Sequence, residues 1–257
     1  VMHRQSRNEM DISLPVYTQC LLVTVLYCIV ALPFLLLFLL LNCFSRARMQ
    51  EVVRFFILWY GKTVIRIGCF PYLRIHYRNL AGEPTDGGIY IFNHRSSSDP
   101  FLVAATTLRP PAQVVNRWPM RLPFFGIFAR AGGYLDITSM SYEEARERTA
   151  ELVARNVPVM VFPEGTRSGS PVMGQFHGTF FRIAKELDCK LVPVVISGNE
   201  QAPSRDFRMH PARIRICKLP RVEQKIVREM PPFQLKNLVR NRILEQSLKM
   251  DREGGGR

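Results

Sequence analysis

An uncharged, mostly apolar stretch of about 31 residues, Leu14–Phe44, is the feature that most restricts how this chain can fold. Roughly 20 such residues cross a bilayer as a helix, and a straight helix of this length would measure roughly 46 Å. Because proline removes a helical hydrogen bond, we expect Pro33 to kink the helix or divide it in two. No small-residue cleavage site ends the stretch. We therefore expect a retained membrane segment, which spans the bilayer or enters one leaflet; a cleaved signal peptide is the alternative.

The residues that follow indicate a helix at the membrane surface. Ser45–Arg48 carries two arginines, and basic residues at a membrane edge are typical of the cytoplasmic side. The segment 51–68 has helical spacing with aromatic and basic side chains, so we interpret it as lying in the interface plane. The alternative is a surface helix packed on the domain. We thus expect a membrane segment and interfacial helix at 1–69, an α/β domain at 70–250 and a disordered tail at 251–257.

From residue 70 onward, short apolar runs alternate with amphipathic segments. This alternation predicts an α/β fold with a mixed, largely parallel sheet flanked by helices, in addition to the N-terminal membrane-embedded helical segment. Ser141 and Glu144 form the pattern of a capping box, and we expect the i,i+4 pairs Glu144–Arg148 and Glu151–Arg155 on the same helix. Strands are predicted near 72–77, 89–92, 113–115, 134–137, 157–162, 190–196, 213–217 and 222–227, and helices near 100–108, 123–130, 141–156, 178–187 and 232–250.

A histidine and an aspartate stand close together where the predicted strand 89–92 ends. The segment reads Asn93-His94-Arg95-Ser96-Ser97-Ser98-Asp99-Pro100. We expect Asp99 to cap the next helix and Pro100 to be its first residue. A turn here would bring His94 and Asp99 together. The carboxylate would then hold the proton on one ring nitrogen and leave the other nitrogen as a base. A cap alone is the plainer interpretation of Asp99, and the two roles are compatible.

A second polar segment, Phe162–Ser168, follows the predicted strand 157–161 and should lie at the same edge of the sheet. Gly165 lets the backbone approach a ligand, Thr166 offers a hydroxyl, and Arg167 offers a planar fork suited to phosphate. Glu164 could orient Arg167 or bind a substrate hydroxyl. The two segments together predict a base beside an anion site. The matching substrate is an amphiphile with a phosphate and a free hydroxyl, whose oxygen would attack an activated acyl carbon.

The charge balance agrees with an anionic partner. The chain has 35 Lys and Arg against 21 Asp and Glu, a net charge of +14. This favours a phospholipid surface, a phosphorylated substrate or nucleic acid. No nucleic-acid partner is expected, because no helix-turn-helix or aromatic RNA-binding signature is visible. The six cysteines show neither a disulfide framework nor a zinc site, which suits a reducing compartment. The basic stretch 205–242 is a solvated face, a membrane-facing patch or a docking face for an acidic carrier protein.

These segments resemble the glycerolipid acyltransferases, including the 1-acylglycerol-3-phosphate acyltransferases, over roughly residues 75–200. Their N-H-x4-D motif stands here as Asn93, His94 and Asp99, and their F-P-E-G-T-R-S motif as Phe162–Ser168. The resemblance implies that His94 is the general base and that Asp99 orients it. It also implies that the phosphate and glycerol of the acceptor are bound by Glu164, Gly165 and Arg167. We add Thr166 to this set because of its hydroxyl.

Two weaker motifs extend the resemblance. Pro123–Gly126 matches the P-F-F-G turn of the second motif. The resemblance implies a basic residue before this turn, and Arg117 would take that role. The acidic residue that the family usually has between the two is missing here, and Trp118 stands near its place. The arginine often found after I-D is also absent, since Asp136 is followed by Ile137. Val192–Val194 resembles a fourth motif and implies a wall of the acyl pocket.

In family terms, the donor would be acyl-CoA or acyl-ACP, with no metal and no organic cofactor. The expected partners are a phospholipid membrane, a lysophospholipid acceptor and the acyl thioester donor, possibly presented on acyl carrier protein. The expected reaction converts 1-acyl-glycerol-3-phosphate to phosphatidic acid on the cytoplasmic face of a membrane. Another lysolipid acceptor, a membrane lipase or esterase, and an inactive lipid-binding relative are the alternatives. The lipase lacks support because no G-x-S-x-G nucleophile elbow is present.

Overall fold

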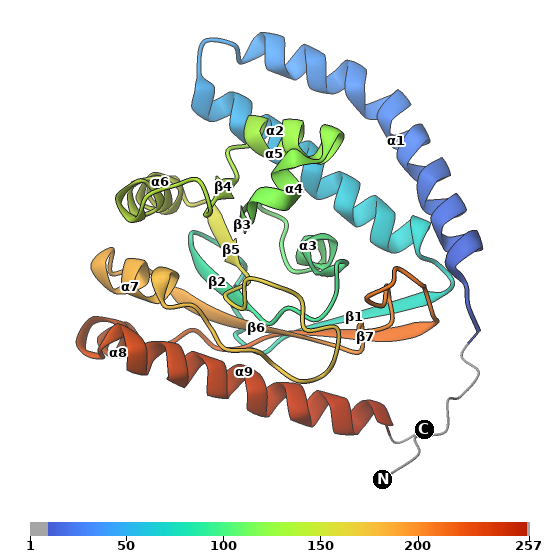
Figure 1. The fold of residues 1–257 in the computed structure, drawn as a ribbon. Coiled ribbons are helices and arrows are strands. Elements are labelled where there is room, and N and C mark those ends of the chain that lie inside the picture. Colours follow the sequence, from blue (N-terminus) through green and yellow to red (C-terminus); the bar gives the residue numbers. More distant parts are fainter. Residues whose placement is uncertain (1–9, 256–257) are drawn as a thin grey trace.

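The computed structural model describes residues 10–255, which form a seven-stranded sheet covered by helices (Figure 1). The strands run in the order β1-β7-β6-β2-β5-β3-β4. Only the β6–β7 pair is antiparallel among these strands, so the predicted mixed, largely parallel sheet is confirmed. The strands are β1 (Leu73–Asn79), β2 (Gly88–Phe92), β3 (Ala112–Val115), β4 (Leu135–Asp136), β5 (Pro158–Val161), β6 (Leu191–Ser197) and β7 (Ala212–Lys218).

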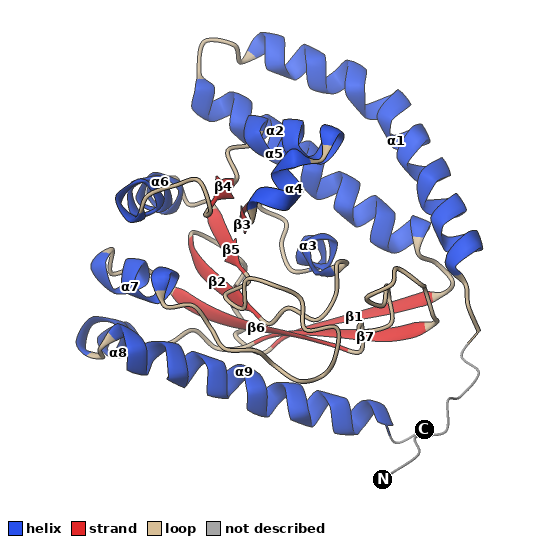
Figure 2. Cartoon of the chain, viewed as in Figure 1, coloured by secondary structure: helices blue, strands red, loops and turns tan. Residues whose placement is uncertain are grey.

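Helices cover both faces of the sheet (Figure 2). The alternation of side chains along β2 shows why: Ile89 and Ile91 pack toward α6 to α9, whereas Tyr90 and Phe92 pack toward α1 to α3. Parallel strands buried on both faces need apolar residues at every position, which β2 supplies. The helices are α1 (Ser13–Leu41), α2 (Arg46–Thr63), α3 (Asp99–Leu102), α4 (Arg117–Arg121), α5 (Pro123–Ala131), α6 (Tyr142–Ala154), α7 (Thr179–Glu186), α8 (Gln224–Glu229) and α9 (Pro232–Gly255), with a π-helical turn at Val64–Gly68 and a 3₁₀ turn at Val103–Ala105.

The apolar N-terminal stretch forms one helix, α1, which continues through Pro33 and is not divided by it. It is the one helix in residues 10–255 that is long and apolar enough to cross a membrane. Side-chain hydrogen bonds hold α1 against the rest of the molecule. Gln19 Nε2 donates to the Ile67 and Phe70 carbonyls at 2.8 and 2.7 Å, and Tyr27 Oη donates to Phe56 O on α2 at 2.7 Å. The predicted interfacial helix begins earlier than expected, at Arg46, and α2 packs on α5 as well as on α1.

Three further sequence predictions differ from the structure. The predicted strand at 222–227 is wrong, because residues 224–229 form the helix α8, which buries Val227 in the core. The predicted tail at 251–257 is wrong for 251–255, which continue α9, while 256–257 lie outside the described residues. The predicted helix 100–108 is shorter, since α3 ends at Leu102 and the 3₁₀ turn at Ala105.

The helix α6 keeps its predicted start but not its predicted ion pairs. The capping box is confirmed, because Ser141 Oγ accepts from Glu144 N at 3.1 Å and Glu144 Oε2 accepts from Ser141 N at 2.9 Å. Arg148 pairs with Glu151 at 2.8 Å instead of with Glu144. Arg155 donates to the Ala47 carbonyl, which ties the end of α6 to the start of α2.

Gly126 is required where α5 crosses α4, because a Cβ there would overlap the backbone carbonyl of Met120. We predict that Gly126→Ala lowers the free energy of unfolding by about 1–3 kcal/mol, the usual cost of overpacking. Chemical unfolding in one fixed detergent measures this change. Gly178→Ala is the matched control, since an added Cβ meets no atom within 4 Å there. Equal stability of the two variants would contradict the packing described for α4 and α5.

Candidate active site

The two polar segments meet, as predicted, at the carboxyl ends of the neighbouring parallel strands β2 and β5. Backbone hydrogen bonds join them directly. Ser168 N donates to His94 O at 2.8 Å, and Gly169 N donates to Arg95 O at 3.0 Å. The two segments therefore form one structural unit, in which the position of one fixes the position of the other.

His94 and Asp99 are in contact, with 2.7 Å between His94 Nδ1 and Asp99 Oδ2. The Asp99 side chain is fully buried and accepts three more hydrogen bonds: from Arg95 N at 2.7 Å, from Ser96 N at 2.9 Å, and from Asn199 Nδ2 at 2.5 Å. An ionised carboxylate can only accept, so the Nδ1 atom carries the proton and Nε2 is left as an acceptor.

Asp99 is therefore not the helix cap that the sequence predicted. The helix α3 begins at Asp99 itself, and Ser98 precedes it without a capping side-chain bond. The carboxylate instead accepts from the two N–H groups of the turn that contains Arg95 and Ser96. It thus holds the backbone after His94 and the His94 ring at the same time.

Glu164 is buried and supports the loop from within. Its Oε1 accepts from His94 N and its Oε2 from Gly174 N, each at 2.7 Å. Burial raises the pKa of its carboxyl, an effect that these two N–H donors oppose. Both carboxylate oxygens are thus engaged by the backbone, and no hydrogen bond joins Glu164 to Arg167 in residues 10–255. The expectation that Glu164 orients Arg167 is wrong.

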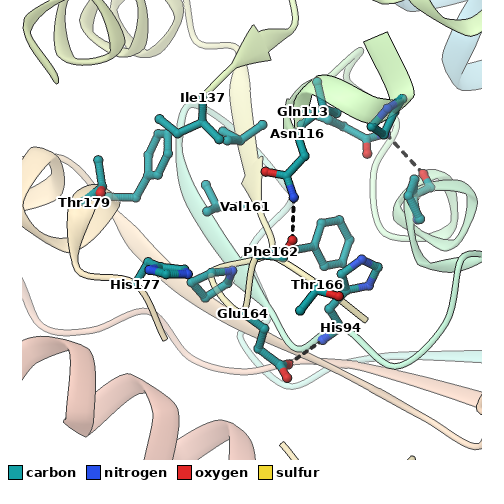
Figure 3. A pocket seen from close by; sticks show the side chains of 17 residues that line it. His94, Gln113, Asn116, Ile137, Val161, Phe162, Glu164, Thr166, His177 and Thr179 are labelled. Atoms are coloured by element: carbon teal, nitrogen blue, oxygen red, sulfur yellow. Dashed lines mark hydrogen bonds between the residues drawn. The ribbon is translucent and has the colours of Figure 1, made fainter. Parts of the chain in front are cut away.

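A cavity of about 530 Å³ opens beside His94 (Figure 3). Gly165 and Thr166 line it together with Asn116 and His177, which the sequence did not single out for this site. Gly165 has φ +71°, and a Cβ there would lie 3.2 Å from His177 Nε2, so glycine is needed for the backbone to pass the ring. Six of the lining residues are large apolar side chains: Val114, Val115, Ile137, Val161, Phe162 and Phe180.

Two predicted anion ligands lie outside this cavity lining. Arg167 Nη2 donates to Arg205 O at 3.2 Å, and its guanidinium lies 4.9 Å from the centre of the Phe207 ring. Arg117 is exposed on α4, where its neighbour Asn116 lines the cavity. The structure therefore places both arginines near the site without bringing either into the cavity. The prediction that Val192–Val194 forms its wall is wrong, because these residues of β6 are buried within the sheet.

Arg95 forms a buried ion-pair network that the sequence did not predict. Its guanidinium pairs with Glu200 and makes two bonds to Asp251, at 2.9 and 2.7 Å. Ser247 Oγ accepts from Arg95 at 2.5 Å, and Ser197 Oγ donates to Asp251 at 2.6 Å. The last turns of α9 are thereby attached to the residue that follows His94. Neither Glu200 nor Asp251 was predicted to be a partner of Arg95.

No group of three or more His, Cys, Asp or Glu among the described residues is placed to hold a metal ion. A base with a fixed proton at the edge of an apolar cavity can remove a proton from a hydroxyl group that enters the mouth. The cavity can receive an aliphatic chain.

Comparisons with known proteins agree with this chemistry. A family model described as "Acyltransferase" matches residues 74–197. The chain is 26% identical to a 1-acyl-sn-glycerol-3-phosphate acyltransferase of Salmonella typhimurium over 242 residues, which cover 91% of this chain and 94% of that protein. It is 27% identical over 184 residues to the Escherichia coli protein of the same name, with 66% and 73% covered. A Limnanthes alba protein of that name is 24% identical over 207 residues, with 70% and 74% covered.

A solved structure shares the fold. The crystal structure of the 1-acyl-sn-glycerophosphate (LPA) acyltransferase PlsC from Thermotoga maritima matches with a TM-score of 0.68 at 18% identity. The match covers 92% of this chain and 98% of that one, so it includes the N-terminal helices as well as the sheet.

The Arg95 network gives a stability prediction. Arg95→Met should lower the free energy of unfolding by about 3–5 kcal/mol, because two carboxylates lose their buried partner. Arg148→Met is the control, since the exposed Arg148–Glu151 pair should contribute less than about 1 kcal/mol. Chemical unfolding in one detergent compares them. If Arg95→Met is no more destabilising than Arg148→Met, the network does not hold α9 to the loop.

Proposed function

Because the chain belongs to the glycerolipid acyltransferase family and is an O-acyltransferase, we propose that it acylates a lysophospholipid. The donor is an acyl thioester, of coenzyme A or acyl carrier protein. The acceptor is 1-acyl-glycerol-3-phosphate, and the product is phosphatidic acid. The observation that carries the proposal is the His94–Asp99 pair at the mouth of an apolar cavity. The names of the relatives support the choice of acceptor.

In this reaction His94 Nε2 takes the proton of the acceptor hydroxyl while Asp99 holds Nδ1–H. The acceptor oxygen attacks the thioester carbonyl carbon, and the carbon–sulfur bond breaks as the tetrahedral intermediate collapses. The thiolate leaves and takes the proton from the imidazolium, which returns His94 to its starting form. A positioned general base contributes about 10²–10⁴-fold to a rate. No metal and no organic cofactor takes part.

The substrates are distributed around His94 by polarity. An acyl chain enters the apolar part of the cavity, where each buried methylene stabilises binding by about 0.8 kcal/mol. The acceptor head group lies beside Thr166 and the Gly165 backbone, which line the cavity. Arg167 and Arg117, which lie outside the cavity lining, bind the phosphate. Arg167 first releases the hydrogen bond that its side chain donates to Arg205 O. Glu164 acts through the backbone of His94.

The membrane holds the enzyme through α1, and the catalytic domain lies on the cytoplasmic face. The basic segment Ser45–Arg48 supports this orientation. Since α1 is fastened along α2 and does not project from the domain, its exposed side enters one leaflet. The acceptor then reaches the site from the same membrane.

His94→Ala should reduce acyl transfer by several orders of magnitude, because proton removal and its coupling to attack are both lost. The assay is product formation from acyl-CoA and 1-acyl-glycerol-3-phosphate, followed by lipid mass spectrometry. His76→Ala, on the exposed edge of β1, is the control and should keep the wild-type rate. A wild-type rate in folded, membrane-bound His94→Ala protein would exclude His94 as the base.

Arg167→Ala should weaken binding of the phosphorylated acceptor by about 1.5–3 kcal/mol, the cost of losing a charged hydrogen bond. We expect a rise in KM for 1-acyl-glycerol-3-phosphate and little change for 1-acyl-glycerol, which lacks the phosphate. Arg208→Ala serves as the control, since that arginine pairs with Asp206 at the surface. An unchanged KM for the phosphorylated acceptor would place the phosphate elsewhere.

A further inference from the structure

The segment formed by α4 and α5 carries a cluster of large apolar side chains on its outer side. Trp118 is 62% exposed, Phe124 81% and Ile127 58%, and Leu122 is exposed as well. Trp118 lies on α4 and Leu122 on the connection between α4 and α5. Phe124 and Ile127 are three residues apart on α5, so these two share one face of that helix. We call these four residues the α4–α5 apolar face. Large exposed apolar side chains gathered on one short segment mark an interaction site more often than scattered single residues do.

The apolar face is not a displaced part of the core. The inner side of the same segment already packs inward, with Met120 and Ala129 buried against Val115 and Tyr134. Gly126 lets α5 pass close to α4, and Arg130 donates to Met120 O at 2.7 Å across the turn. The inner side of the segment is therefore occupied by packing, and the four exposed side chains point away from it.

The charge around this face fits an anionic partner. Arg117 and Arg121 are exposed beside it, and neither forms an ion pair within residues 10–255. The sequence contains no Asp or Glu between Asp99 and Asp136. Aromatic and aliphatic side chains flanked by arginines, with no acidic residue, are typical of segments that lie at the surface of an anionic bilayer.

The segment that carries the apolar face packs on the N-terminal helix α2. Arg54 of α2 donates to Gly132 O at 2.8 Å, and Ile57 of α2 packs on the Met120 and Ala129 cluster. Figure 1 shows α1, α2, α4 and α5 on one side of the sheet and α9 on the other. A membrane that receives the exposed side of α1 would thus be close to α4 and α5.

The same short segment also forms part of the cavity. Asn116 and Pro119 line it, whereas Arg117 and Trp118 between them are exposed. We propose that the α4–α5 apolar face is a second membrane-docking surface, which rests in the head-group region of an anionic phospholipid bilayer and places the cavity mouth at the level of the lipids. The inference rests on the proposed function only in taking the bilayer as the source of the acceptor.

The two tryptophans of the chain, Trp59 and Trp118, allow a direct test. In the Trp59→Phe variant, Trp118 is the sole tryptophan. The full chain is bound to vesicles of phosphatidylcholine and phosphatidylglycerol whose acyl chains carry bromine at a known depth. We expect a blue shift of Trp118 emission and quenching that is strongest for bromines close to the head groups. The readout does not depend on catalysis, so it stands even if the proposed reaction is wrong.

Two results would overturn the proposal. One is Trp118 emission that brominated vesicles leave unchanged and aqueous iodide quenches freely. The other is a shift seen only on adding acidic acyl carrier protein, which would assign the face to that protein.

A second measurement separates docking from anchoring by α1. The double variant Phe124→Asp, Ile127→Asp should stay bound to the vesicles, yet acylate a vesicle-embedded acceptor at least about tenfold more slowly than wild type, since both side chains lose their apolar burial in the bilayer. Its rate with a water-soluble short-chain acceptor should be unchanged. Phe233→Asp, on an exposed position of α9, is the control and should alter neither rate. Equal slowing with both acceptors would point to a damaged fold and contradict a docking role.

Discussion

The carboxylate of Asp99 is the interaction on which the rest of the site depends. It is fully buried and accepts four hydrogen bonds, from one ring nitrogen, one amide side chain and two backbone N–H groups. A buried charge is tolerated only when it is satisfied in this way. The same four bonds fix the ring of His94, the turn that follows it and, through Asn199, the loop after β6. A proton acceptor of defined orientation is thus a consequence of how the protein solvates one buried carboxylate.

The surrounding structure keeps this turn in place from several directions. Glu164, which follows the neighbouring strand β5, accepts a hydrogen bond from the backbone N–H of His94. Arg95, the residue after His94, is bonded to Asp251 near the end of α9. Residues that approach the cavity from outside are less constrained, and the arginines proposed to bind phosphate are among them. In the reaction that we propose, the fixed part serves the chemistry that is common to any acyl transfer, whereas the exposed part serves recognition of the acceptor and the membrane.

The sequence predicted those features that local patterns encode. The strands β2 and β5 are short apolar runs, and each is followed directly by one of the two polar segments. Neighbouring parallel strands end at the same edge of a sheet, so the two polar segments come together there. The sequence did not predict features that depend on contacts between residues far apart in the chain. Asp251 lies 156 positions from Arg95, and nothing near it indicates a buried partner. The 222–227 segment is predicted as a strand, but residues 224–229 form α8, whose Ile226 and Val227 pack against the core. Glu164 is predicted as a substrate-binding residue because its partners, the N–H groups of His94 and Gly174, lie outside its own motif.

The central claim is that Asp99 fixes the protonation of His94, with the proton on Nδ1 and the lone pair on Nε2. Nitrogen chemical shifts of ¹⁵N-labelled histidine at neutral pH, assigned by the signal that disappears in His94→Gln, report this tautomer directly. We predict a protonated Nδ1 and an unprotonated Nε2 in the wild-type protein. A proton on Nε2, with Nδ1 bare, would contradict the role given to both residues.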